Sequence, residues 1–152
     1  MLLHKKMIYS VILAIFFVIL DRFFKILALN YYENIKLDLI SDYFGFTLAK
    51  NYYIAFSLPL SGPILTVFIV VIILILLYFE LTLIKKQEHI QAMCLTFVIF
   101  GAISNVIDRI KYGFVIDYLD LKYFTVFNIA DSMIVVGVVL FIILNKKAII
   151  SK

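Results

Sequence analysis

Two short segments of the chain repeat one pattern, in which an asparagine precedes an aspartate by three residues within an apolar stretch. The segments are Asn105–Asp108 and Asn128–Asp131. An ionisable side chain at membrane depth is costly, and it is therefore a functional hypothesis by default. Two aspartates that meet there would share one proton, because like charges held close together cannot both ionise readily. The pattern indicates acid–base chemistry if Asp108 and Asp131 lie together.

The composition shows whether these residues lie in water or in a membrane. The chain has 152 residues, of which 65% are hydrophobic and 16% charged, and its mean hydropathy is +1.11. A helical span needs about 20 apolar residues, so four spans and their connections use most of residues 1–152 and leave no room for a second, soluble domain. The single cysteine, Cys94, lies in an apolar run and has no partner for an internal disulfide. We expect one membrane-embedded domain.

Four apolar segments predict an all-α polytopic membrane protein. The expected spans are approximately 7–29, 62–84, 90–108 and 124–144, with an outer loop over 30–61. The first segment starts like a signal peptide, but its length and the lack of a cleavage pattern favour a retained span. Lysines gather before the first span, between the second and third, and after the fourth. Because positive residues concentrate on the cytoplasmic side, we expect both termini to be cytoplasmic.

This topology brings three carboxylates to similar depth near the outer side of the membrane. At a rise of about 1.5 Å per residue, Asp108 lies roughly 27 Å along the third span and Asp21 roughly 21 Å along the first. Asp131 lies roughly 10 Å into the fourth span, which runs back inward. The spacing also places each asparagine on the same helical face as its aspartate.

Each motif also has a plainer interpretation. Asn128 could cap a late-starting fourth helix with Asp131 in its first turn, where the helix dipole favours a carboxylate. Asp108 could form an ion pair with Arg109 at the end of the third span. Neither interpretation explains why the two motifs occur at matched depth. A third polar group, Asp21 with Lys25 four residues later, predicts a structural ion pair within the first span.

Five motifs resemble those of the lipoprotein signal peptidases, also called signal peptidase II, a family of bacterial intramembrane aspartic peptidases. Asp21–Lys25 resembles the family pattern D-x-x-x-K, and Asn51–Phe56 resembles N-x-G-x-A-F. Further along the chain, Ser104–Arg109 resembles G-N-x-x-D-R, Val115–Tyr118 resembles V-x-D-F, and Phe127–Ser132 resembles F-N-x-A-D-S. The chain departs from the family pattern at three positions where glycine is common, which are Tyr53, Phe100 and Ser104. A tyrosine in place of a glycine alters the backbone conformations open to the outer loop.

The resemblance implies that Asp108 and Asp131 are the catalytic pair of an aspartic endopeptidase. Such an enzyme removes the signal peptide from diacylglyceryl-modified prolipoproteins by cutting just before the lipidated cysteine. The resemblance also implies substrate-binding or pair-positioning roles for five residues, namely Asn51, Asn105, Arg109, Asn128 and Ala130. Asp21 and Lys25 are expected to be structural.

The resemblance further implies the partners and the location. The expected partners are prolipoprotein signal peptides and membrane lipids, with no nucleic acid, no metal and no cofactor. We expect a monomer in the bacterial cytoplasmic membrane, with the active site facing the extracytoplasmic side. The outer loop alternates apolar and small residues over 44–48, which predicts a small β-structured cradle, and residues 55–60 suggest an interfacial helix over the site. The alternative for this aromatic-rich loop is a belt at the membrane interface.

Two other classes of protein would use the same residues differently. A transporter or proton channel also needs membrane carboxylates, but its polar path must continue to the cytoplasmic side. The inner halves of the spans offer few polar residues, most of them near the inner ends, and these are Glu80, Thr82, Gln91 and Thr96. A structural subunit would use the motifs as polar contacts between helices and would tolerate replacement of each aspartate by asparagine.

Overall fold

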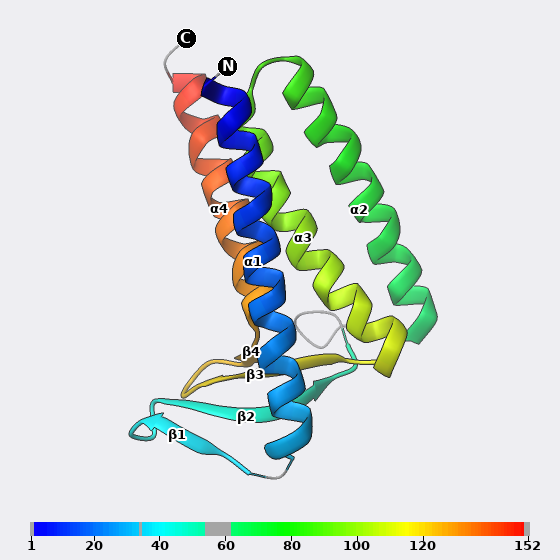
Figure 1. Cartoon of the computed structure of the whole chain (residues 1–152), viewed down its shortest axis with the longest axis vertical. Helices are drawn as coiled ribbons and strands as arrows, with labels where there is room; N and C mark the ends of the chain where they lie inside the picture. The colour runs from blue at the N-terminus through cyan, green and yellow to red at the C-terminus, as the bar shows by residue number, and fades with distance from the viewer. Residues whose placement is uncertain (1, 34, 54–61, 151–152) are drawn as a thin grey trace.

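The computed structural model describes residues 2–33, 35–53 and 62–150. Within these residues the chain forms four helices and four strands, in the order α1 (Leu2–Tyr31), β1 (Leu37–Ile40), β2 (Phe44–Asn51), α2 (Gly62–Lys85), α3 (His89–Tyr112), β3 (Val115–Leu121), β4 (Val126–Phe127) and α4 (Ile129–Ile150). The helices run side by side as a bundle, and the strands form a sheet across one end of it (Figure 1).

Three of the helices are long and apolar enough to cross a membrane, namely α2, α3 and the Ile129–Lys146 part of α4. In the apolar 18-residue stretch of each helix, 11% of the residues of α2 and 17% of those of α4 are buried inside the protein, whereas 56% of those of α3 are buried. The helix α3 is therefore the centre of the bundle, in contact with α1, α2 and α4. Apolar side chains that face outward from the other helices are favourable only in a lipid environment.

Glycines allow α3 and α4 to approach closely. A Cβ atom at Gly101 would lie 2.5 Å from the carbonyl oxygen of Ala130, and one at Gly137 would lie 2.7 Å from that of Cys94. Small residues at helix contacts are the usual route to tight packing in membranes. The close contact at Gly101 brings the first turn of α4, which carries Asp131, against the wall of α3.

The sheet is antiparallel with the strand order β1-β2-β3-β4. Strands β2 and β3 pair from Phe44 with Leu121 to Asn51 with Val115. The sheet packs against the end of α1 through a small core formed by Ala28, Phe46, Ile116 and Tyr118. Gly113 reverses the chain between α3 and β3 with φ +80°, and its N–H donates to Arg109 O (3.0 Å), as is usual for a glycine that ends a helix. The strand β3 therefore begins beside the last turn of α3.

The mostly helical fold with a small antiparallel sheet agrees with the prediction, but two element boundaries differ. The fourth helix begins at Ile129 and not near residue 124, because Val126 and Phe127 form β4 by pairing with Asp120 and Leu119 of β3. The third helix continues to Tyr112, beyond the expected end at 108. The predicted interfacial helix lies outside the described residues.

Candidate active site

Asp131 lies in the first turn of α4 and is joined to Asn128 by a reciprocal pair of hydrogen bonds. The backbone N–H of Asp131 donates to Asn128 Oδ1 (2.7 Å), and the backbone N–H of Asn128 donates to Asp131 Oδ2 (3.2 Å). This arrangement is a variant of the capping box at a helix N-terminus. The helix cap that the second motif suggested is therefore present, and it coexists with the polar site, because the amide nitrogen of Asn128 points to a second carboxylate.

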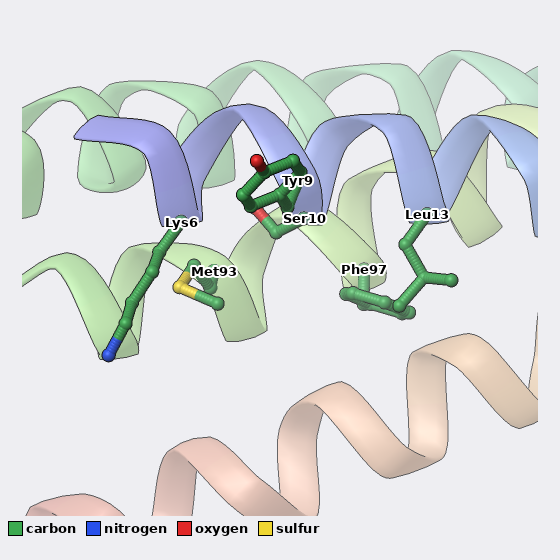
Figure 2. A pocket seen from close by; sticks show the side chains of 6 residues that line it. All are labelled: Lys6, Tyr9, Ser10, Leu13, Met93 and Phe97. Carbon is green, nitrogen blue, oxygen red and sulfur yellow. The ribbon is translucent and has the colours of Figure 1, made fainter. Parts of the chain in front are cut away.

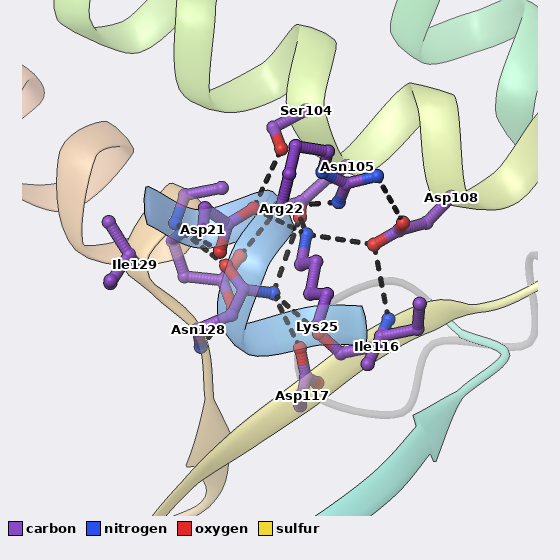
Figure 3. Close-up of polar contacts among 12 residues, drawn as sticks. Asp21, Arg22, Lys25, Ser104, Asn105, Asp108, Ile116, Asp117, Asn128 and Ile129 are labelled. Carbon is purple, nitrogen blue, oxygen red and sulfur yellow. Dashed lines mark hydrogen bonds and ion pairs between the residues drawn. The ribbon is translucent and has the colours of Figure 1, made fainter. Parts of the chain in front are cut away.

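That second carboxylate belongs to Asp117 in β3, which is 2% exposed. Asn128 Nδ2 donates to Asp117 Oδ1 (2.6 Å), and Asn51 Nδ2 donates to Asp117 Oδ2 (3.1 Å). Burial raises the pKa of Asp117 to about 7, and the negative charge of Asp131 adds to the rise, whereas the two amide hydrogen bonds oppose it. Figure 3 shows Asp117 facing Asn128 across the site. Asp117 and Asp131 thus lie on either side of the Asn128 side chain.

Asn105 holds the other side of Asp131. Its Nδ2 donates to Asp131 Oδ1 (2.7 Å), and its Oδ1 accepts from Lys25 Nζ (2.9 Å) and from Asn128 Nδ2 (3.3 Å). The two asparagines of the repeated pattern therefore contact each other as well as the carboxylates. Buried amides in such a network are stabilising when every partner is satisfied.

Asp108 is paired with cations and not with Asp131. Its Oδ1 lies 2.7 Å from Arg22 Nη1, its Oδ2 lies 2.7 Å from Lys25 Nζ, and the backbone N–H of Ile116 donates to Oδ2 (3.3 Å). Among the described residues, Asp108 forms no hydrogen bond or ion pair with Asp131 or Arg109. Both carboxylate oxygens of Asp108 thus contact groups other than Asp131, and the catalytic pairing of Asp108 with Asp131 stays a prediction.

Asp108 belongs to a closed set of four charges. Lys25 Nζ also lies 2.9 Å from Asp21 Oδ2, which is the expected pair four residues apart in α1. The carboxylate of Asp21 is 0% exposed and Lys25 is 1% exposed. Two cations, Arg22 and Lys25, thus offset two anions, Asp21 and Asp108. Unpaired buried charge is costly, and within this polar site the neutral set leaves two carboxylates, those of Asp117 and Asp131, whose charge is not offset by a direct ion pair.

Arg109 and Ala130 lie at the edge of the site. The Arg109 guanidinium donates to the carbonyl oxygens of Tyr52 (3.4 Å) and Tyr53 (2.8 Å) and so holds the chain that follows β2. Asn51 Oδ1 accepts from the backbone N–H of Tyr53 (3.2 Å). Ala130 is fully buried, and its backbone packs directly against Gly101 of α3. A larger side chain at either position would push α4 away from α3.

Sequence reasoning missed two functional candidates, Asp117 and Arg22. Asp117 is an acidic residue within the apolar run from Phe114 to Leu119, and it lies in the Val115–Tyr118 motif, for which the resemblance alone predicts no role. That run is the signal that could have identified it. Arg22 occupies a variable position of the D-x-x-x-K pattern, and no sequence signal distinguished it.

A separate pocket of about 200 Å³ lies between α1 and α3 at the opposite end of the bundle (Figure 2). Its lining is almost wholly apolar, and its Ser10 hydroxyl donates to Met7 O (2.8 Å). None of its lining residues carries a carboxylate. The described residues also hold no group of three or more His, Cys, Asp or Glu side chains arranged to bind a metal ion. The polar site near the sheet is therefore the candidate for chemistry.

The fold and the site together define a multi-pass membrane protein with a buried acidic site at one end of its bundle. The model of the family described as signal peptidase (SPase) II matches residues 13–146. The lipoprotein signal peptidase of Caldanaerobacter subterraneus subsp. tengcongensis is 35% identical over 134 residues, which cover 86% of this chain and 91% of the relative. That of Halothermothrix orenii is 33% identical and covers 90% and 93%.

Two solved structures have the same fold. One is a bacterial membrane enzyme determined by the in meso method at 2.3 Å resolution, with a TM-score of 0.83, 28% identity, and coverage of 95% of this chain and 91% of that one. The other, at 1.9 Å resolution, has a TM-score of 0.74 and 29% identity, with coverage of 89% and 90%. The chain belongs to the signal peptidase II family and is a peptidase, as its motifs indicated.

Proposed function

We propose that this chain is an intramembrane aspartic endopeptidase that removes the signal peptide from diacylglyceryl-modified prolipoproteins, cutting just before the lipidated cysteine. The substrate class follows from the relatives, which are lipoprotein signal peptidases. The aspartic mechanism rests on one observation, the buried carboxylate of Asp117 and the half-buried carboxylate of Asp131, which share contacts with Asn128. We therefore propose Asp117, in place of Asp108, as the catalytic partner of Asp131.

Charge balance supports a shared proton on this pair. Because Asp21, Arg22, Lys25 and Asp108 offset one another, the remaining charges near the site are the two carboxylates and the Arg109 guanidinium. A single proton on the pair leaves one negative charge, which Arg109 offsets. Two ionised carboxylates would leave an excess of buried negative charge, which is the condition that raises the pKa of one member of such a pair.

The pair then acts as acid and base on a water molecule. The ionised carboxylate accepts a proton from the water, which attacks the scissile carbonyl carbon, while the protonated carboxylic acid polarises the carbonyl oxygen. The tetrahedral intermediate collapses when the leaving nitrogen takes a proton and the C–N bond breaks. The pair titrates as a unit, so neither aspartate is assigned the proton. Asn51, Asn105 and Asn128 hold the carboxylate oxygens in place.

We also propose four membrane spans, in which α1 is the span that completes the bundle, with both termini cytoplasmic. Lysines lie at the ends of the helices remote from the sheet, and α1 runs beside α3 and α4 in Figure 1. The site then faces the extracytoplasmic side of a bacterial plasma membrane. Acyl chains held in the outer leaflet would present the cleavage point at this level.

The test compares purified Asp117→Asn, Asp131→Asn and Asp42→Asn enzymes on a lipid-modified precursor, with cleavage followed by gel mobility. We expect the first two to lose all cleavage and the third to cleave at the wild-type rate. Asp42 is a matched control because its side chain is 80% exposed and lies in a turn of the sheet. Cleavage at the wild-type rate by Asp117→Asn or Asp131→Asn would contradict the proposal.

A further inference from the structure

The first turn of α4, which carries Asp131, is held by side chains from three other places in the fold. The N–H of Ile129 donates to Tyr118 Oη (3.2 Å), and the N–H of Ala130 donates to Asp21 Oδ1 (3.3 Å). The N–H of Asp131 donates to Asn128 Oδ1. The first N–H groups of a helix have no acceptor within the helix. Here each of these N–H groups has a side-chain acceptor.

Asp21 is the centre of this arrangement. Tyr118 Oη donates to Asp21 Oδ1 (3.0 Å), and Ser104 Oγ donates to Asp21 Oδ2 (2.7 Å). All three side chains are fully buried, and Figure 3 shows Ser104 reaching Asp21 from α3. A carboxylate at a helix N-terminus is favoured by the helix dipole. The two hydroxyls therefore orient a charged cap on the helix that carries Asp131.

The Tyr118 hydroxyl has a further property that suits this role. It donates one hydrogen bond to Asp21 and accepts one from Ile129, so it links β3 directly to α4. Burial raises the pKa of the Tyr118 phenol above its ordinary value, and the nearby charge of Asp21 adds to the rise. The phenol thus keeps its proton to higher pH than an ordinary tyrosine and remains a donor.

We propose that Tyr118 and Ser104 are positioning residues, which fix the first turn of α4 through Asp21 and so set the orientation of the Asp131 carboxylate. This inference rests on the proposed function, because it takes Asp131 as a reacting group. Small displacements of a reacting group lower the rate of the chemical step strongly. Neither hydroxyl is exposed to a substrate, so their removal acts on kcat and leaves KM unchanged.

The experiment uses the full-length enzyme in detergent and three variants, Tyr118→Phe, Ser104→Ala and Tyr32→Phe. Tyr118→Phe keeps the ring that packs against Phe24 and Phe46 and removes the hydroxyl. Tyr32→Phe is the matched control, since its ring packs on the same Phe46 and its hydroxyl makes no hydrogen bond within the described residues. Thermal unfolding establishes the temperature at which all variants are folded, and kcat and KM for a lipid-modified precursor are measured below it.

We expect kcat to fall about tenfold in Tyr118→Phe and Ser104→Ala, with KM within about twofold of wild type and Tyr32→Phe unchanged. Wild-type kcat in both test variants would overturn the inference, as would an equal loss in Tyr32→Phe or a rise in KM that accounts for the whole effect. Failure of the proposed function has a different signature, because Asp131→Asn would then still cleave. An inactive Asp131→Asn with full-rate Tyr118→Phe and Ser104→Ala refutes the positioning role alone.

Discussion

Replacement of Asn51 by leucine tests how the proton is held on the proposed pair. The amide of Asn51 donates to Asp117 Oδ2 at 3.1 Å, and this hydrogen bond lowers the pKa of Asp117, which burial and Asp131 raise to about 7. Leucine has nearly the shape of asparagine but donates no hydrogen bond. Without the donor, the charged form of Asp117 is less stable, and the pKa of Asp117 rises further.

The magnitude follows from the strength of one hydrogen bond to a charged group. Such a bond contributes about 1.5 kcal/mol at the lower end of its range, which suits the half-buried position of Asn51. One pKa unit corresponds to about 1.4 kcal/mol, so the expected rise is about one unit. Activity requires one proton on the pair and is lost as the pH rises through the pKa at which that proton leaves. The alkaline limb of the pH profile should therefore move upward by about one pH unit.

The assay measures the initial rate of cleavage of a lipid-modified precursor at saturating substrate between about pH 5 and about pH 10, since kcat reports ionisations in the enzyme–substrate complex. Thr47→Val is the control, because Thr47 lies on the same strand and its hydroxyl donates to a backbone carbonyl, that of Ile35 (3.3 Å). An alkaline limb that stays in place or moves to lower pH in Asn51→Leu would refute the role of Asp117 in holding the proton.

Three further results follow from the contacts of the site. Lys25→Met removes the cation shared by Asp21 and Asp108 and should lower the free energy of unfolding by about 3–5 kcal/mol. Lys36→Met breaks an exposed ion pair and should lower it far less, and thermal unfolding in detergent measures both. Gly101→Ala places a Cβ atom 2.5 Å from Ala130 O and forces α4 to shift. The shift should lower the free energy of unfolding by about 1–3 kcal/mol and should also slow precursor cleavage. Stability and cleavage equal to wild type would contradict the close helix contact. Asp117 has a pKa of about 7 in the folded protein against an ordinary value of 3.8, so between these pH values the folded state binds a proton that the unfolded state has lost. The free energy of unfolding of the wild type should therefore decline between these pH values and level off above them, and Asp117→Asn should remove that part of the decline. An unchanged pH dependence of unfolding in the variant would contradict the raised pKa.

The sequence was sufficient for the family, because its motifs carry the resemblance, and for the helices, because the length of an apolar run reflects the thickness of the membrane. It was not sufficient to choose between Asp108 and Asp117. Asp108 lies near the end of α3 and Asp117 lies in the strand that follows it, and the choice depends on which carboxylate the cations of α1 reach. Arg22 and Lys25 contact Asp108, and that contact is decided by the rotation of α1 against α3, which no short pattern encodes.

The second motif shows a different limit. The Asn-x-x-Asp spacing was compatible with a helix cap or with a polar site, and the structure contains both in the same residues. Asn128 Oδ1 caps α4 while Asn128 Nδ2 reaches Asp117. The start of α4 at Ile129 could not be predicted from the sequence either. Val126 and Phe127 are apolar enough to extend the helix, but they form a strand by pairing with β3.

The most direct measurement of the central claim is the rate at which purified Asp117→Asn enzyme, shown to be folded by thermal unfolding, cleaves a lipid-modified precursor. If Asp117 and Asp131 share the catalytic proton, the variant is folded and cleaves no faster than a no-enzyme control. Cleavage at the wild-type rate would contradict the pairing and would remove Asp117 from the reaction.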